Sequence, residues 1–157
     1  MSSTRSLEDW LDAYGESHQN ATNKLIHWIC VPIIAYSILA FASLVNFPAP
    51  FNVGLFENLA SVLVLGAFLF YLRLSVPMAF AMLIFGGLCL FIADLAATSP
   101  IPLWETSLTL FISAWLGQFY GHKIEGKKPS FLKDLQFLMI GPAWLMADLF
   151  RKVGIKY

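Results

Sequence analysis

Residues 76–97, VPMAFAMLIFGGLCLFIADLAA, decide the class of fold. Their only charged residue is Asp94, and their length matches the roughly 17–25 residues that a helix needs to cross a bilayer. Three more apolar stretches, at residues 25–45, 55–72 and 103–120, have similar lengths. None shows the alternation of a barrel strand, so we predict an all-α polytopic membrane protein with about four transmembrane helices.

The overall composition points to the same class. Hydrophobic residues make up 58% of the 157 residues and charged residues 13%, whereas soluble domains have about 45–50% and about 25%. We therefore expect a single membrane-embedded domain over residues 1–157, surrounded by a lipid bilayer. The formal net charge is zero, which disfavours nucleic acid as a partner. The oligomeric state stays open, and a homo-oligomer is one option.

The positions of lysine and arginine predict the orientation. They occur before the stretch 25–45, between 55–72 and 76–97, and after 103–120, whereas the other two connections carry none. By the positive-inside rule, both termini and the middle connection are cytoplasmic. The same pattern fits a bacterial inner membrane and the endoplasmic reticulum.

Both ends of the chain are predicted to be amphipathic segments that lie on the membrane surface. Apolar side chains recur at helical spacing near the N-terminus, namely Leu7, Trp10, Leu11 and Tyr14. The tail, residues 130–157, contains a short apolar stretch interrupted by Gly141 and Pro142. That stretch is too short and too broken for a fifth span, and its Trp144 suits an anchor at the interface.

All three histidines fall at the cytoplasmic ends of predicted spans. His18 and His27 flank the entrance of the first span, and His122 follows the fourth. A straight helix would place His18 and His27 on opposite faces, because they are nine positions apart. Asn20 and Asn23 are good helix-capping residues, so they favour a break between the two. The sequence therefore predicts a three-histidine metal site at the cytoplasmic face of the membrane.

Polar residues at helical spacing from the histidines are candidate partners of this site. The residues predicted to hold the ligands in place by hydrogen bonds are Asn20, Asn23 and Gln118. Glu125 lies three positions after His122 on the same helical face. It can either ligate the metal or set the tautomer of His122, and both options stay open.

Three segments of the chain resemble the Mpo1-like family, which is also catalogued as a domain of unknown function, DUF962. They are YGESHQNATNKLIHWICVP at 14–32, GQFYGHKIEGKKPS at 117–130 and GPAWLMADL at 141–149. The resemblance implies a membrane-bound Fe(II)-dependent dioxygenase that shortens 2-hydroxy fatty acids by one carbon. It implies His18, His27 and His122 as the residues of the iron site. Asp148 stands where the family often has glutamate, so no fourth acidic ligand is assigned.

Such a substrate suits the predicted position of the site. Three neutral imidazoles on Fe(II) leave up to three positions open, where the carboxylate and 2-hydroxyl of a long-chain 2-hydroxy fatty acid could bind together with O2. The acyl chain would stay in hydrocarbon between the helices. The substrate carboxylate could be attracted by Lys123, Lys127 and Lys128, although the positive-inside rule also accounts for lysines at these three positions.

Two other functions fit the same residues. A non-catalytic four-helix membrane protein could bind haem, a lipid or a partner, with the histidines as axial ligands or interface anchors. A zinc-dependent membrane hydrolase could use three histidines and one open coordination position. A diiron membrane hydroxylase is disfavoured, because such enzymes carry many more histidines than the three present.

Overall fold

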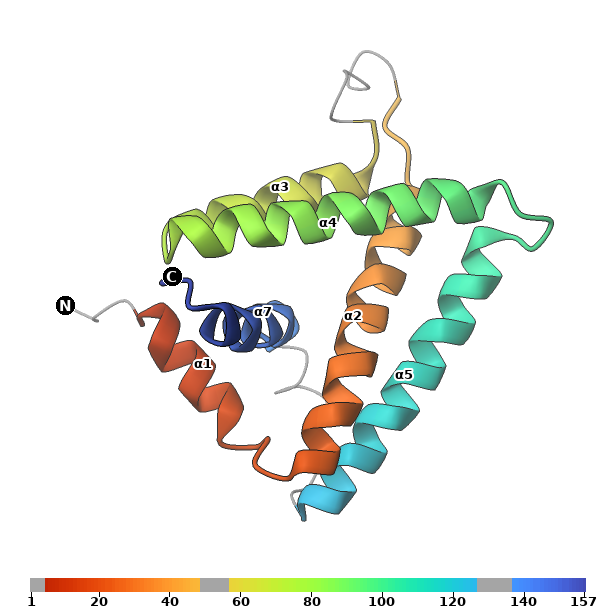
Figure 1. Ribbon diagram of the computed structural model, residues 1–157. Helices are drawn as coiled ribbons and strands as arrows, with labels where there is room; N and C mark the ends of the chain where they lie inside the picture. The colour runs from red at the N-terminus through yellow and green to blue at the C-terminus, as the bar shows by residue number, and fades with distance from the viewer. Residues whose placement is uncertain (1–4, 49–56, 127–136) are drawn as a thin grey trace.

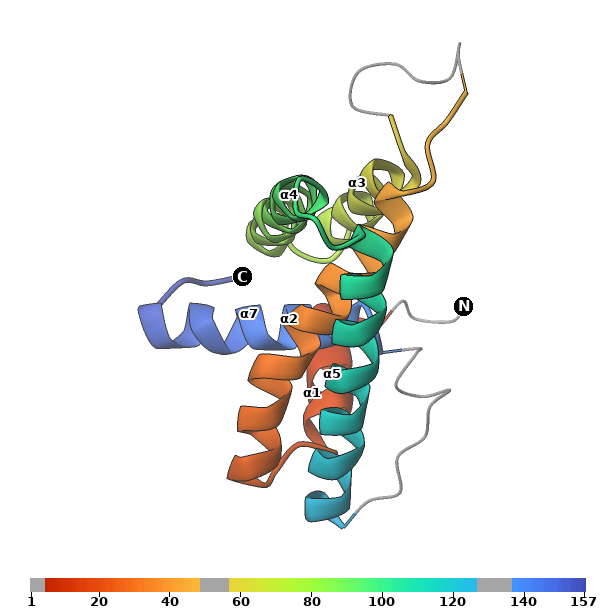
Figure 2. The same ribbon diagram turned by 90° about the vertical axis from the view of Figure 1, so that its right-hand side faces the viewer.

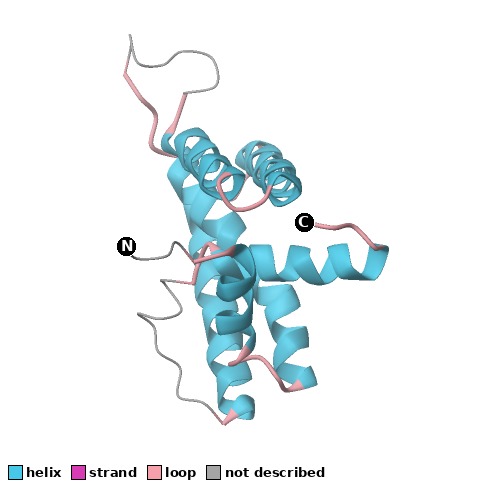
Figure 3. Cartoon of the chain, turned by 90° about the vertical axis from the view of Figure 1, so that its left-hand side faces the viewer, coloured by secondary structure: helices cyan, strands magenta, loops and turns pink. Residues whose placement is uncertain are grey.

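The structure is a computed structural model that describes residues 5–48, 57–126 and 137–157. These residues form six helices and no strand (Figure 3). The helices are α1 (Leu7–Gly15), α2 (Ala21–Ser43), α3 (Leu59–Leu72), α4 (Val76–Ala97), α5 (Leu103–Glu125) and α7 (Ile140–Val153). The prediction of an all-α chain is confirmed.

Two pairs of helices set the shape of the molecule. Helices α2 and α5 lie side by side and run in opposite directions (Figures 1 and 2). The α3–α4 hairpin runs across one end of this pair, and α7 packs against α1, α2 and α4 below the hairpin (Figure 1). The start of α2 and the end of α5 therefore meet at the end of the molecule farthest from the hairpin.

Side-chain caps decide where several helices begin. Asn20 caps α2, and its Oδ1 accepts hydrogen bonds from the backbone N–H groups of Thr22 and Asn23 at 2.9 and 3.3 Å. The chain consequently bends between α1 and α2, at residues 16–20. This is the break that separates His18 from the helix of His27, and it lies just before α2 rather than inside its first turn.

Two glycines let α2 and α5 approach each other closely. A Cβ atom added at Gly117 would lie 2.7 Å from the Sγ of Cys30, and one at Gly121 would collide with the Oδ1 of Asn23. Neither contact is tolerable for a real side chain. The small residues at 117 and 121 are therefore what brings the end of α5 against the start of α2.

The prediction of four spans has to be corrected to two candidates. Only α2 and α4, among the described helices, are both long and apolar enough to cross a membrane, and core helices of soluble proteins pass the same test. Helix α3 has 14 residues, which is about 21 Å of helix and shorter than a bilayer core of about 30 Å. Helix α5 has 23 residues, but its serines, threonines, Gln118 and Glu105 lower its hydropathy.

The C-terminal segment is a packed helix rather than a broken surface segment. Pro142 lies in the first turn of α7, where a missing N–H costs no hydrogen bond, so it helps to begin the helix. Trp144 is buried against α1 instead of serving as an interfacial anchor. Helix α7 thus forms one side of the core, together with Leu7, Leu11 and Tyr14 of α1.

Candidate metal centre

The three histidines come together at the end of the α2–α5 pair. His18 lies in the connection between α1 and α2, His27 in the second turn of α2, and His122 in the last turn of α5. Their side chains are 3%, 1% and 5% exposed. One ring nitrogen of each lies within 4.8 Å of the others, and no other His, Cys, Asp or Glu group in the described residues has this arrangement.

The backbone fixes the tautomer of two of these histidines. The Nδ1 of His18 lies 2.6 Å from the carbonyl oxygen of Tyr14, and the Nδ1 of His27 lies 3.0 Å from that of Asn23. A carbonyl oxygen can only accept, so each Nδ1 carries a proton, and in the neutral ring the lone pair is then on Nε2. This neutral form, held by a backbone carbonyl, is the usual form of a metal-ligating histidine.

Glu125 fastens the end of α5 to the segment that carries His18. Its carboxylate accepts hydrogen bonds from the backbone N–H groups of Gln19 and Asn20, at 2.8 and 2.9 Å, and from the Nδ2 of Asn23, at 3.0 Å. Partial burial raises the pKa of Glu125, but these three hydrogen bonds outweigh burial and hold the pKa below its ordinary value. Both carboxylate oxygens are thus engaged by donors beside the histidines.

The other predicted supporting residues take different places. Asn20 caps α2, whereas Asn23 is fully buried and its Nδ2 also donates to the carbonyl oxygen of Ser17, at 3.2 Å. The structure therefore places Asn20 and Asn23 where they hold the His18 segment. Gln118, one turn before His122, lines a cavity instead, and its Oε1 makes no hydrogen bond to any described residue.

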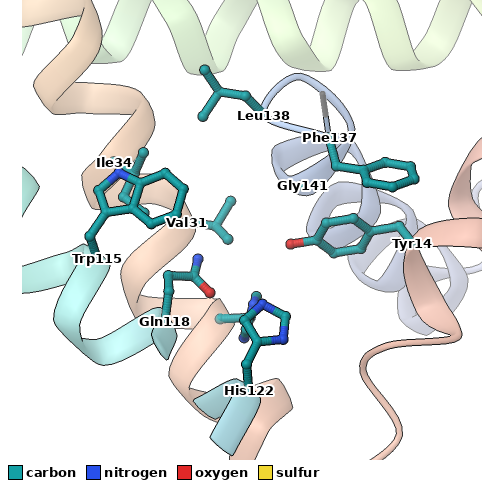
Figure 4. Close-up of a pocket in the computed structure, with 10 residues that line it drawn as sticks. Tyr14, Val31, Ile34, Trp115, Gln118, His122, Phe137, Leu138 and Gly141 are labelled. Atoms are coloured by element: carbon teal, nitrogen blue, oxygen red, sulfur yellow. The ribbon is translucent and has the colours of Figure 1, made fainter. Parts of the chain in front are cut away.

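That cavity lies directly beside the histidines (Figure 4). It measures about 30 Å³, which is room for a small polar group and not for a long acyl chain. Its polar side is formed by Tyr14, His27, Gln118 and His122. Its apolar side is formed by Val31, Ile34, Trp115, Phe137 and Leu138.

Comparison with known proteins agrees with the motifs. The family model "2-hydroxy-palmitic acid dioxygenase Mpo1-like" matches residues 4–153. The chain belongs to the Mpo1-like family. It is 28% identical over 154 residues to "2-hydroxy-palmitic acid dioxygenase MPO1" of Saccharomyces cerevisiae, and the match covers 94% of this chain and 82% of the yeast protein. No solved structure matches the chain.

Tyr14 is the site residue of this Mpo1-like chain that the sequence reasoning missed. Its ring stacks on that of His18 with 4.2 Å between centroids, and it meets the ring of His27 edge-on at 6.4 Å. From the sequence, Tyr14 was predicted only to lie on the apolar face of a helix. Two features of the sequence indicate a place for Tyr14 in the site. It lies four residues before His18, and it begins the first of the three segments that resemble the family.

None of the described charged residues predicted for the site lines the cavity. Lys123 is exposed on α5 and does not line it, and Lys127 and Lys128 fall outside the described residues. Asp148 pairs with Lys152 on α7, at 2.9 Å. A role of these lysines in attracting a substrate stays a prediction.

Proposed function

We propose that this Mpo1-like chain is an Fe(II)-dependent dioxygenase that shortens long-chain 2-hydroxy fatty acids by one carbon at a membrane surface. The supporting observation is the group of three buried histidines, whose ligand atoms lie within 4.8 Å of one another. The substrate class rests on the yeast relative, whose name describes a 2-hydroxy-palmitic acid dioxygenase.

The donor set of the site fits a divalent transition metal. The hydrogen bonds at Nδ1 leave Nε2 as the ligand atom of His18 and His27, and imidazole suits iron, zinc and copper alike. Zn²⁺ has no redox chemistry, so a dioxygenase needs another ion. Fe(II), held by His18, His27 and His122, would supply the electron transfer that lets dioxygen react. Glu125 is proposed to position His18 rather than to ligate the metal, because its oxygens already accept three hydrogen bonds.

The proposed reaction balances without another reductant. One 2-hydroxy acid, R–CH(OH)–COOH, and one O2 give R–COOH, CO2 and H2O. The bond between carbons 1 and 2 breaks, and the four electrons that reduce O2 come from oxidation of these two carbons. The chain therefore needs no site for a nicotinamide or flavin, and only the substrate, dioxygen and the metal have to meet beside the histidines.

The spacing of the rings argues against haem. The ring centroids of the three histidines lie 4.1, 5.1 and 5.4 Å apart. A porphyrin held by two axial histidines needs their rings on opposite faces of the macrocycle, and rings this close together leave no room for it. A single metal ion therefore fits the site better than a macrocycle.

We also propose that the chain is embedded in a membrane, with the site at the cytoplasmic surface. Helix α4 exposes a stripe of large apolar side chains at intervals of three and four residues, each more than half exposed: Phe80, Ile84, Leu88, Phe91 and Leu95. A smaller stripe on α5 contains Leu108, Ile112 and Leu116. Exposed apolar surface of this extent is unfavourable in water and is typical of contact with lipid or protein.

Metal reconstitution tests the proposal. The protein, stripped of metal, is reloaded with Fe(II) or with Zn²⁺ and given 2-hydroxypalmitate under oxygen. We expect only the iron form to release a fatty acid that is one carbon shorter, together with CO2. An iron form that binds one ion per chain and leaves the 2-hydroxy acid intact would contradict the proposed reaction and move the assignment to the zinc hydrolase.

A further inference from the structure

Gln118 is a buried amide at the cavity beside the histidines. Its side chain is 6% exposed, and its Oε1 has no hydrogen-bond partner within residues 5–48, 57–126 and 137–157. Leaving a buried acceptor unpaired destabilises the folded state. Such groups in native proteins call for an explanation, and a role in the chemistry of a site is one of them.

The surroundings of Gln118 indicate which ligand part would reach it. Figure 4 shows its amide extending into the cavity beside His122, and the hydroxyl of Tyr14 pointing into the same space from the opposite side. Val31 and Trp115 cover the cavity on the side away from the histidines. A compact polar head whose nearest carbons touch Val31 and Trp115 matches this arrangement, and the rest of a long chain has to lie outside the cavity.

The position of Tyr14 is fixed by its neighbours. Its ring is stacked on His18 and packed against Trp144, with 4.2 and 5.5 Å between ring centroids. A Cβ atom added at Gly141 would lie only 3.2 Å from the Tyr14 hydroxyl oxygen, so the glycine of α7 leaves the hydroxyl its space. Tyr14 and Gln118 therefore face each other across the cavity (Figure 4).

We propose that Gln118 recognises the 2-hydroxyl group of the substrate by a hydrogen bond. Gln118 is thereby the residue that selects 2-hydroxy acids over unsubstituted fatty acids. Its Oε1 accepts the hydrogen bond of the 2-hydroxyl and its Nε2 donates to the carboxylate, to which Tyr14 also donates. An unsubstituted fatty acid leaves the Oε1 unpaired, and a site built around such a hydrogen bond rejects the analogue that lacks it. This inference rests on the proposed substrate class, but not on the oxidation itself.

Binding under nitrogen tests the selectivity without turnover. Trp115 lines the cavity and Trp144 packs against Tyr14, so a change in the tryptophan fluorescence of the full chain reports occupancy when 2-hydroxypalmitate or palmitate is titrated in detergent. We expect the wild type to prefer the 2-hydroxy acid by at least about tenfold. In Gln118→Met, which keeps the length of the side chain but cannot form these bonds, the preference falls by about tenfold, the effect of one such bond.

Tyr14→Phe separates the two contacts. It removes only a donor to the carboxylate, which both acids share, so we expect it to weaken both acids by about fivefold and to leave the preference unchanged. Tyr120→Phe is the matched control, since Tyr120 is 61% exposed on α5, and it should change neither affinity. A preference that survives in Gln118→Met would overturn the proposal.

Thermal unfolding separates recognition from a structural role. Gln118→Met removes an unpaired buried acceptor, so its midpoint should equal or exceed that of the wild type without ligand. A clear fall in the midpoint would show that Gln118 supports the fold and would also overturn the proposal. A wild type that prefers 2-hydroxypalmitate but consumes no oxygen would contradict the dioxygenase function and leave the role of Gln118 intact.

Discussion

At the scale of single residues, the backbone holds the rings of two of the three histidines. His18 and His27 each donate from Nδ1 to a carbonyl oxygen four residues earlier. The sequence shows the spacing of four residues, but it does not show which atom accepts the hydrogen bond of each histidine. Asn23 illustrates this, because its backbone carbonyl, rather than its side chain, accepts from His27.

Removal of one histidine should empty the site. We expect His18→Ala, His27→Ala and His122→Ala each to lose tightly bound metal and to lower oxygen-dependent breakdown of 2-hydroxypalmitate by more than about 100-fold, since even residues that only support a ligand contribute about 10–100-fold. Membrane insertion should be unchanged. Metal analysis with a product assay checks this, and full activity in His122→Ala would rule the site out.

Glu125 should act on the metal through His18. In Glu125→Gln an amide nitrogen faces the N–H donors of Gln19 or Asn20, so the segment with His18 loosens. We expect metal affinity to fall by about 10–100-fold. Glu105→Gln, at the exposed other end of α5, is the matched control. Titration with a competing chelator measures the affinity, and equal values for wild type and Glu125→Gln would contradict a positioning role.

Because of the Glu125 carboxylate, the stability of the folded chain should depend on pH. The pKa of Glu125 is lowered in the folded chain from 4.5, so its ionised form favours the folded state above that pH, and the advantage is lost as pH falls through the lowered pKa. The wild type should therefore unfold at a higher temperature than Glu125→Gln at pH 6, and the difference should shrink toward pH 3. A constant difference would contradict this assignment.

At the scale of the elements, the contact between α2 and α5 holds the site together. Gly121→Ala would push a methyl group into Asn23, which also bonds Glu125, and we expect a loss of about 1–3 kcal/mol in the free energy of unfolding together with weaker metal binding. Gly87→Ala on α4 has no atom within 4 Å of the added carbon and serves as the control. Chemical denaturation checks both, and equal stabilities would contradict close helix contact.

The sequence predicts the elements around the site better than those away from it. The cap at Asn20 and the positions of the three histidines suffice to expect two helices whose ends meet. By contrast, a hydropathy pattern records that a side chain is apolar, not whether lipid or protein covers it. The α3–α4 hairpin laid across α2 and α5, and the packing of Trp144 in the core, depend on such partners and could not be predicted.

At the scale of the whole molecule, the exposed apolar stripe of α4 bears on where the protein works. If lipid covers Ile84 and its neighbours, the chain should stay in the membrane fraction after washing with alkaline carbonate, because burial of apolar area and not charge holds it there. Release of the folded chain into the soluble fraction would contradict the membrane proposal. It would also require another protein surface to cover the stripe.

A single assay tests the central claim most directly. The protein is purified without oxygen, its iron is quantified, and oxygen uptake is followed after addition of 2-hydroxypalmitate, with His122→Ala measured alongside. The account predicts about one iron per chain and one O2 consumed for each CO2 and each shortened fatty acid released, with none of this in the variant. Bound zinc with no oxygen uptake, or equal uptake by His122→Ala, would contradict it.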